Sequence, residues 1–369
     1  MNILVTGAKG FIGQNVSLWL KNNGHTVLGV DVDNVANLAS LVAKSDFIIH
    51  LAGVNRPMNK EEFYDGNTNF TKHLVDVIYA SNKKIPLIYA SSIQASLDND
   101  YGKSKKMAED YLFNSSLPVY IYRLANVFGK WCRPNYNSAL STFAYNIAHD
   151  LPIEIRDKEY VVHYNYIDDI CQSWLDIINL DSHSGSKEIL SIKPVYDCSL
   201  GHLADLLYSF KESRNNLSTP STKDEFERKL YATYLSYLPT DKFSYDLNMH
   251  IDNRGSFTEF LKTPFNGQVS VNIAKPGITK GNHYHHTKNE KFLTVSGTCS
   301  IKFRKVNDDK MIEYIVSGDK LQVVDIPTGY THSITNIGDT DSVTIMWANE
   351  PFDPNYPDTY YEEVIKDGK

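Results

Sequence analysis

The first half of the chain alternates short apolar runs with segments of helical spacing. Apolar runs predict buried strands at residues 2–6, 25–30, 46–51, 86–91 and 119–123. Apolar positions three and four residues apart predict helices at residues 11–23, 67–80, 101–113 and 138–149. Strands that alternate with helices favour a parallel sheet covered on both faces. We therefore predict an α/β region with a Rossmann-type, doubly wound sheet.

The pattern changes in the second half of the chain. A polar stretch at residues 214–221 and a helix-like, tyrosine-rich connector at 226–238 precede the change. Short β-rich runs then follow at about ten-residue intervals, at residues 268–273, 291–295, 299–304, 311–317, 321–326 and 343–347. This spacing predicts an all-β jelly-roll barrel. We expect two domains, residues 1–245 and 246–369.

Composition excludes several classes of protein. The 369 residues are 42% hydrophobic and carry a net charge of −7 without a basic cluster, so nucleic-acid binding is disfavoured. No apolar run approaches the roughly 20 residues of a membrane helix, and no secretion signal precedes the first strand. The four cysteines are scattered without metal or redox spacing. We expect a cytoplasmic protein with reduced thiols and no membrane insertion.

A glycine-rich turn follows the first predicted strand. It reads TGAKGFIG over residues 6–13 and leads directly into the first predicted helix. Glycines at such a turn let the backbone approach a pyrophosphate, and the amides of the helix N-terminus can donate to its oxygens. The turn therefore predicts a dinucleotide site with contacts from Gly7, Lys9, Gly10, Phe11, Ile12 and Gly13.

Asp31 follows the second predicted strand. A carboxylate at this place can accept hydrogen bonds from a ribose 2′-hydroxyl, which favours NADH over NADPH. The alternative is a surface aspartate that shares a turn with Asp33.

Tyr101 and Lys105 lie four residues apart at the start of a predicted helix, so they share one face. A nearby ammonium and a cofactor ribose can lower the pKa of the phenol, which would let Tyr101 exchange a proton with a substrate oxygen. Ser92, after the fourth strand, would polarise the substrate carbonyl, and Ser91 is the alternative. These residues predict a reductase site.

The glycine spacing TGxxGxxG resembles the short-chain dehydrogenase/reductase superfamily. Three further segments, HLAG at 50–53, RLANVFG at 123–129 and NYIDD at 165–169, resemble its extended branch of sugar-nucleotide enzymes. The resemblance implies that Leu51, Ala52 and Gly53 contact the cofactor and that Asn126 contacts the substrate. The alternative for Asn126 is a turn residue after a strand.

The second half carries a histidine pattern that resembles the two cupin motifs. His283, His285 and Glu290 match the first motif, and His332 matches the second. On a strand, His283 and His285 would point the same way, and we expect Glu290 and His332 on neighbouring strands. Three imidazoles and a carboxylate suit a divalent metal, and we favour Zn²⁺ over Fe²⁺ or Mn²⁺. The ion could be catalytic or purely structural.

Residues 252–259, DNRGSFTE, resemble a segment of the sugar-nucleotide 3,5-epimerases. In that family a histidine at the place of His283 is the general base. His283 cannot easily be both a metal ligand and a base, and we favour the ligand. The base is then unassigned, with His286 and Tyr330 as candidates.

Over nearly its whole length the chain resembles the bifunctional capsular polysaccharide reductases of CapF type. FGKWC at 128–132, YLSYLP at 234–239 and GNHYHH at 281–286 carry this resemblance. It implies a UDP-2-acetamido-2,6-dideoxy-L-arabino-4-hexulose substrate. The cupin would invert C3, and the short-chain domain would reduce C4 to the L-talose sugar, on the way to UDP-N-acetyl-L-fucosamine. The family implies NADPH, from which Asp31 departs.

Two alternatives remain open from the sequence. The short-chain domain could be an epimerase or dehydratase with tightly bound NAD. The cupin could be a non-catalytic module that uses its metal to stabilise a dimer. In either case we expect a homodimer that binds a UDP-linked 4-keto-6-deoxy amino sugar.

Overall fold

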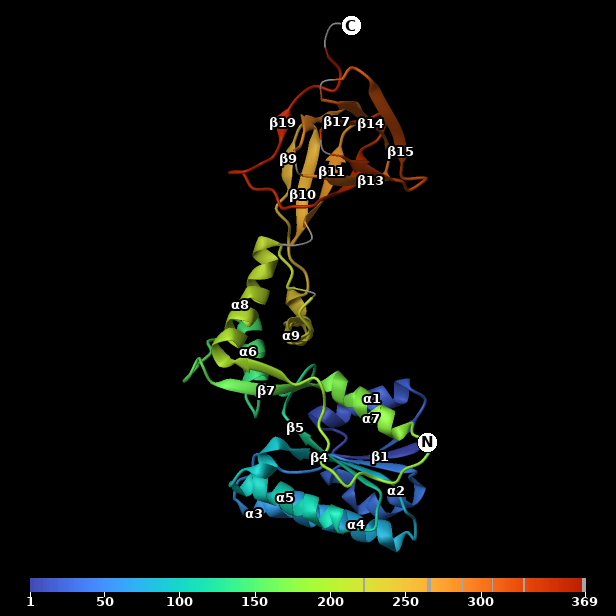
Figure 1. The fold of residues 1–369 in the computed structure, drawn as a ribbon, viewed down its shortest axis with the longest axis vertical. Coiled ribbons are helices and arrows are strands. Elements are labelled where there is room, and N and C mark those ends of the chain that lie inside the picture. The colour runs from blue at the N-terminus through green and yellow to red at the C-terminus, as the bar shows by residue number, and fades with distance from the viewer. Residues whose placement is uncertain (222, 264–266, 287, 307, 328, 367–369) are drawn as a thin grey trace. The chain divides into compact units, whose positions relative to one another are not determined.

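The computed structural model describes residues 1–221, 223–263, 267–286, 288–306, 308–327 and 329–366, shown as a ribbon in Figure 1. These residues form two compact units. The first comprises Met1–Tyr208 with Thr222–Pro239, and the second comprises Ser209–Ser221 with Thr240–Lys369. The motif residues Thr287 and Thr328 lie outside the described residues. The predicted domain boundary between residues 245 and 246 differs from this division, in which residues 209–221 group with the second unit, and it stays a prediction.

The first unit is built on a five-stranded parallel sheet of order β2-β1-β3-β4-β5. Its strands are β1 (Asn2–Thr6), β2 (Thr26–Val30), β3 (Phe47–His50), β4 (Leu87–Ser92) and β5 (Val119–Leu124). All four residues of β3 are buried, as expected for a strand covered on both faces. Each of the five strands coincides with a predicted run to within about two residues.

Helices cover both faces of this sheet. The covering helices are α1 (Phe11–Asn22), α2 (Leu38–Lys44), α4 (Phe70–Ala80), α5 (Asp100–Phe113) and α7 (Ile167–Ile178). The other helices of the chain are α3 (Glu61–Phe63), α6 (Ala139–Ala148), α8 (Leu200–Asn216) and α9 (Glu225–Leu235). One apolar core joins the sheet to α1 and α7, and the other joins it to α2, α4 and α5. The doubly wound prediction is confirmed.

The strand order reverses beside β1. Strand β2 lies on one side of β1 and β3 lies on the other. In open parallel sheets, the carboxyl ends of the strands at such a reversal form the ligand crevice. The fold therefore places the glycine turn after β1 and the segment after β3 at the same crevice.

A small sheet of β6 (Asn126–Phe128), β7 (Val161–Tyr166) and β8 (Tyr196–Ser199) also belongs to the first unit. Phe226 on α9 contacts the rings of Phe128, Tyr164 and Tyr196 within this sheet. The predicted connector at 226–238 is thus a helix that packs on the first unit.

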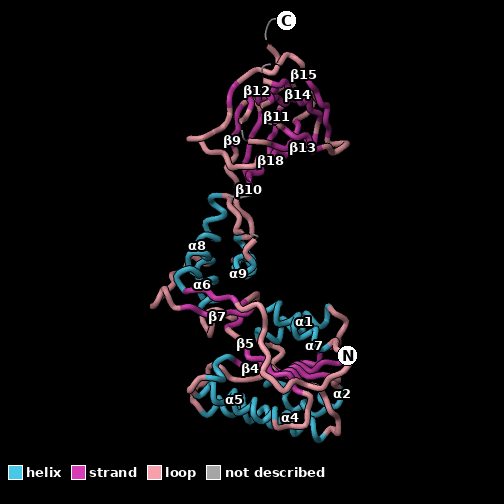
Figure 2. The backbone as a smooth tube through the Cα atoms, in the orientation of Figure 1, coloured by secondary structure: helices cyan, strands magenta, loops and turns pink. Residues whose placement is uncertain are grey.

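The main body of the second unit is formed by two antiparallel sheets, which appear as magenta strands in Figure 2. One has the order β16-β13-β18-β11-β10-β9, and the other has the order β15-β14-β17-β12-β19. Their bounds are β9 (His250–Asp252), β10 (Gly255–Thr263), β11 (Gly267–Ala274), β12 (Thr279–Tyr284), β13 (Glu290–Ser296), β14 (Thr298–Lys305), β15 (Met311–Ser317), β16 (Val323–Ile326), β17 (Tyr330–Asn336), β18 (Ser342–Ala348) and β19 (Tyr360–Tyr361). The predicted all-β architecture is confirmed.

None of the helices among the described residues is long and apolar enough to cross a bilayer.

Candidate active site and metal centre

The glycine turn after β1 is shaped by close backbone approaches. Gly7 has a φ of 71°, and a Cβ there would lie 3.0 Å from the Ala52 nitrogen. A Cβ on Gly13 would lie 2.1 Å from the Gly7 carbonyl oxygen. Helix α1 begins at Phe11, and its N-cap residue Gly10 has no side chain that could fill the cap. The first amides of α1 are therefore placed to receive phosphate oxygens.

Asp31 anchors this turn to the end of β2. Its carboxylate accepts hydrogen bonds from the Lys9 backbone nitrogen at 3.1 and 3.2 Å. The Lys9 ammonium pairs instead with Asp33, which is exposed. A carboxylate has more acceptor positions than one amide uses, so Asp31 can still meet a ribose hydroxyl.

The segment after β3 closes the crevice from the other side. The Thr6 hydroxyl accepts hydrogen bonds from the backbone nitrogens of Leu51 and Ala52, each at 3.1 Å. A Cβ on Gly53 would lie 2.5 Å from the Asn67 side-chain oxygen and 3.4 Å from Lys105 Nζ. The absence of a side chain at Gly53 therefore leaves the lysine ammonium room beside the crevice.

The predicted reductase residues meet where β4 ends and α5 begins. Lys105 is buried, and its Nζ donates to the Ala90 carbonyl at 3.0 Å. Burial lowers the pKa of Lys105 to about 8. Burial also raises the pKa of Tyr101, and a hydrogen bond with Ser92 opposes that rise. Burial outweighs the Ser92 contact in this balance, and the lowered phenol pKa that the sequence suggested, which depends on a cofactor ribose, stays a prediction.

The two candidate serines have different partners. Ser91 donates to the buried carboxylate of Glu109 at 2.5 Å, and Arg123 donates to the same carboxylate at 2.9 and 2.7 Å. Ser92 instead lies at the phenol of Tyr101. The structure therefore places Ser92, rather than Ser91, beside Tyr101. Sequence reasoning missed the Glu109–Arg123 pair, although Arg123 begins one of the quoted motifs.

Asn126 lies on the exposed start of β6. Its side-chain amide donates to the His163 carbonyl of β7 at 3.3 Å. This contact does not bring Asn126 to Tyr101, so its contact with substrate stays a prediction.

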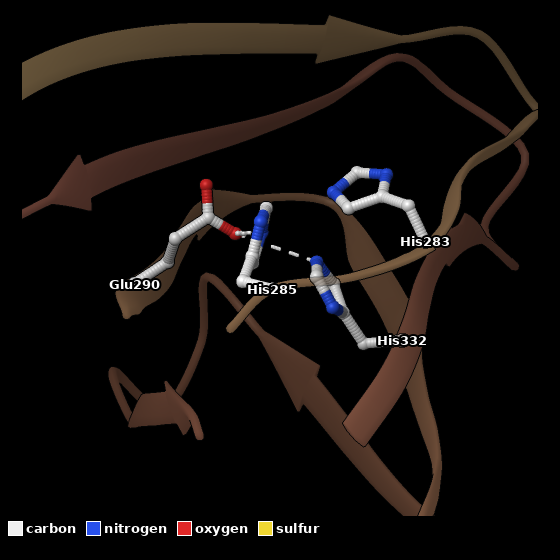
Figure 3. Close-up of side chains that lie close together, drawn as sticks. All are labelled: His283, His285, Glu290 and His332. Atoms are coloured by element: carbon white, nitrogen blue, oxygen red, sulfur yellow. Dashed lines mark ion pairs between the residues drawn. The ribbon is translucent and has the colours of Figure 1, made fainter. Parts of the chain in front are cut away.

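In the second unit, His283, His285, Glu290 and His332 lie together (Figure 3), with potential ligand atoms all within 4.8 Å of one another. His283 on β12 pairs directly with His332 on β17, and His285 follows the end of β12. Glu290 begins β13, which belongs to the other sheet. The sequence predicted Glu290 on a neighbouring strand, but the barrel brings it from the opposite sheet.

The hydrogen bonds and charges of these side chains suit them to bind a cation. The Nδ1–H of His285 donates to the Asp358 carbonyl at 2.6 Å, which leaves Nε2 as a free lone pair towards the cluster. His285 Nε2 and Glu290 Oε2 are buried without a well-formed hydrogen bond among the described residues, 3.4 Å apart. Burial and the neighbouring imidazoles lower the pKa of His283 to about 4, so it is neutral at pH 7. These donors match the ligands of Zn²⁺.

The carboxylate of the cluster remains ionised. Burial alone would raise the pKa of Glu290, but its contacts with His285 and His332 hold that pKa well below its usual range. The cluster therefore combines a negative charge with three imidazoles inside the barrel, a combination that a divalent cation would stabilise.

A cavity of about 570 Å³ opens over this cluster. Phe257 and Glu259, from the epimerase-like segment, lie in its wall, whereas Asp252 and Arg254 of that segment pair with each other at an exposed turn. The described lining includes neither His286 nor Tyr330. The volume is in the range of small-molecule pockets.

The comparisons with known proteins cover both units. Residues 3–192 match the NAD dependent epimerase/dehydratase family, and residues 250–360 match the polysaccharide biosynthesis C-terminal domain. The UDP-2-acetamido-2,6-beta-L-arabino-hexul-4-ose reductase of Pseudomonas aeruginosa is 45% identical over 98% of each chain.

Solved structures agree over nearly the whole length. The capsular polysaccharide assembling protein CapF from Staphylococcus aureus is 52% identical, with a TM-score of 0.92 over 99% of this chain and 100% of that one. A structure of CapF with the inhibitor 3-isopropenyl-tropolone is 49% identical, with a TM-score of 0.86 over the same shares. The chain therefore belongs to the family of CapF-type capsular polysaccharide proteins, in which a nicotinamide-dependent epimerase/dehydratase domain precedes a polysaccharide biosynthesis C-terminal domain.

Proposed function

We propose that the chain is a bifunctional enzyme of capsular polysaccharide synthesis. Its second unit epimerises C3 of UDP-2-acetamido-2,6-dideoxy-L-arabino-4-hexulose, and its first unit reduces the C4 ketone to UDP-2-acetamido-2,6-dideoxy-L-talose. The product would lead to UDP-N-acetyl-L-fucosamine. The main support for the reductase activity is the contact of Tyr101 with Ser92 beside the buried Lys105, at the crevice of the parallel sheet. The identity to a 4-ketoreductase supports the substrate class.

In the reduction, a bound nicotinamide supplies the hydride that C4 receives. Tyr101 gives its phenolic proton to the ketone oxygen, so the carbonyl becomes a hydroxyl. Ser92 donates a hydrogen bond to the same oxygen and holds the ketone near the phenol. The Lys105 ammonium then stabilises the phenolate until Tyr101 regains a proton from solvent.

The choice of cofactor belongs to this proposal. Asp31 carries a negative charge at the ribose end of the crevice, although Lys9 already donates to it. We propose that this charge lets the enzyme use NADH and weakens its use of NADPH.

The proposed epimerisation removes the C3 proton and returns one to the opposite face of the sugar. A divalent ion, which we propose to be Zn²⁺, would draw electron density from the adjacent C4 oxygen and so acidify C3. His283, His285, Glu290 and His332 would hold that ion. Tropolones are hydroxy-ketones, a class that chelates divalent ions, so the inhibitor of the related CapF suits an accessible metal.

A second candidate for the second unit is a purely structural metal. Four protein ligands complete a tetrahedral shell and leave no open position for substrate. The cavity above the cluster favours the catalytic proposal, because a structural ion needs no pocket of about 570 Å³.

One experiment separates these proposals. The full-length chain is incubated with the UDP-linked 4-keto sugar in D₂O, without nicotinamide, and C3 is followed by NMR. Epimerisation requires deuterium at C3, and a chelator should abolish that exchange. Subsequent NADH or NADPH should give the L-talose sugar. Full exchange in metal-free, folded protein would make the ion structural, and absence of exchange in the metal-loaded protein would remove the epimerase function.

We also propose a cytoplasmic homodimer. Light scattering on the purified protein would give its mass in solution. A mass near the 41.9 kDa of one chain would contradict the dimer.

A further inference from the structure

The cavity of the second unit contains a buried amide that its neighbours leave unsatisfied. Asn272 on β11 lines the cavity and is 1% exposed. Its Nδ2 has no hydrogen-bond partner among the described residues. Buried polar groups are nearly always paired, so a donor left unpaired at the wall of a pocket points to a ligand.

The orientation of this amide is fixed by Lys280 on β12. The Lys280 ammonium donates to Asn272 Oδ1 at 2.8 Å, and also to the carbonyls of Ile273 at 3.0 Å and Ser256 at 3.3 Å. An ammonium can only donate, so it selects the amide oxygen of Asn272 and turns the NH₂ group away from itself. With its three protons directed to three acceptors, Lys280 has a positioning role and is not the missing base.

A second buried asparagine in the same barrel shows what a structural amide looks like. The Nδ2 of Asn336 donates to the carbonyls of Ala274 and Thr340, each at 2.8 Å, and its Oδ1 accepts from the Gly338 nitrogen at 3.0 Å. Both residues are 1% exposed. Burial alone therefore does not explain the open Nδ2 of Asn272.

The position of Lys280 relates this donor to the metal cluster. On the ladder between β12 and β17, Lys280 pairs with Ile334, and His283 pairs with His332. Two strand residues span roughly 7 Å, which is about the length of one sugar ring with its substituents. Asn272 and the four residues of the cluster also line the same cavity, so a sugar with one oxygen at the cluster can present another oxygen towards Asn272.

Resting on the proposed function, we infer that Asn272 is a substrate-binding residue of the second unit and that Lys280 positions it. The Nδ2–H of Asn272 donates to a carbonyl oxygen of the bound sugar. The proposed substrate offers two such oxygens, one on C4 and one on the 2-acetamido group. The same donor suits either of them, and kinetics can distinguish them.

The direct test observes the amide itself. The side-chain amide signals of Asn272 in full-length ¹⁵N-labelled protein are assigned by their loss in the variant Asn272→Asp. Addition of the UDP-linked 4-keto sugar should shift these signals, whereas those of Asn336 should stay in place. Unchanged Asn272 signals at a sugar concentration that saturates the protein would overturn the inference, whether or not the second unit is an epimerase.

Exchange at C3 then identifies the oxygen. Asn272→Asp keeps the acceptor for Lys280 but loses the donor. We expect at least a tenfold loss of kcat/KM for exchange, with metal content and the reduction of an already epimerised ketone unchanged. A loss in kcat would identify the C4 oxygen as the acceptor of the Asn272 hydrogen bond. A rise in KM alone would identify the acetamido oxygen as that acceptor. Lys280→Arg should retain more exchange than Lys280→Met, as expected for a positioning cation. Exchange in Asn272→Asp equal to that of the unmodified chain would contradict the inference while leaving the proposed function intact.

Discussion

The two units assemble their reactive groups in different ways. In the first unit, the groups come from turns that follow parallel strands and from the start of helix α5, so short sequence segments carry most of the site. In the second unit, the cluster is formed by side chains from two sheets, and Glu290 and His332 are far apart in the sequence. A site made of strand ends and helix starts depends on a few local motifs, whereas a site inside a barrel depends on the register of the entire unit.

The largest expected effect tests whether the first unit works by proton transfer. Tyr101→Phe removes the phenolic proton but retains the ring, so cofactor binding should stay normal while C4 reduction falls about 100-fold or more. C3 exchange in the second unit should be unchanged, because its groups are separate. Stopped-flow absorbance of the nicotinamide measures the hydride step. Near-normal reduction in this variant would remove Tyr101 from its proposed role.

Removal of a proposed metal ligand tests the second unit in the same way. His285→Ala removes one ligand and the contact with the Asp358 carbonyl, so bound metal and C3 exchange should both fall by tenfold or more. Reduction of a ketone that is already epimerised should continue. Metal content is measured by mass spectrometry, and circular dichroism confirms that the variant is folded. Retained metal with full exchange would exclude His285 as a ligand.

A smaller effect distinguishes the paired serines. Ser92→Ala should slow reduction by about 10- to 100-fold, because a donor to the developing alkoxide is lost. Ser91→Ala is the matched control: it removes a hydrogen bond to Glu109 and should lower the free energy of unfolding by about 1 kcal/mol. Chemical denaturation and steady-state rates together measure both effects. A larger rate loss in the Ser91 variant would reverse the assignment.

The smallest expected effect concerns the cofactor. Asp31→Asn removes a charge but keeps an acceptor for the Lys9 amide, so the ratio of kcat/KM for NADPH to that for NADH should rise about tenfold. Asp33→Asn is the control, since Asp33 is exposed and pairs with the Lys9 side chain. A strong preference of the unmodified enzyme for NADPH would show that Asp31 does not repel the 2′-phosphate.

Local patterns predicted the central strands and the glycine turn because both depend on residues close together in sequence. The runs that became β1 to β5 are mostly apolar, as a sheet covered on both faces requires. Strands β7 and β8 and helices α7 and α8 were not predicted as elements. The polar residues His163 and Asn165 interrupt the apolar pattern of β7, whereas α7 is strongly amphipathic and its spacing could have been recognised.

The sequence by itself determined the two classes of fold and most of the candidate residues, because periodicity and motif spacing are local properties. The tertiary structure decided which partner each side chain contacts. It turned Ser91 towards Glu109 and Ser92 towards Tyr101, although the two are neighbours in the chain. Among the described residues it also left the Nδ2 of Asn272 without a partner while pairing that of Asn336, and only the packing of one sheet against the other brings Lys280 to the amide oxygen of Asn272. Hydrogen-bond partners depend on which strands meet, and no local pattern encodes that.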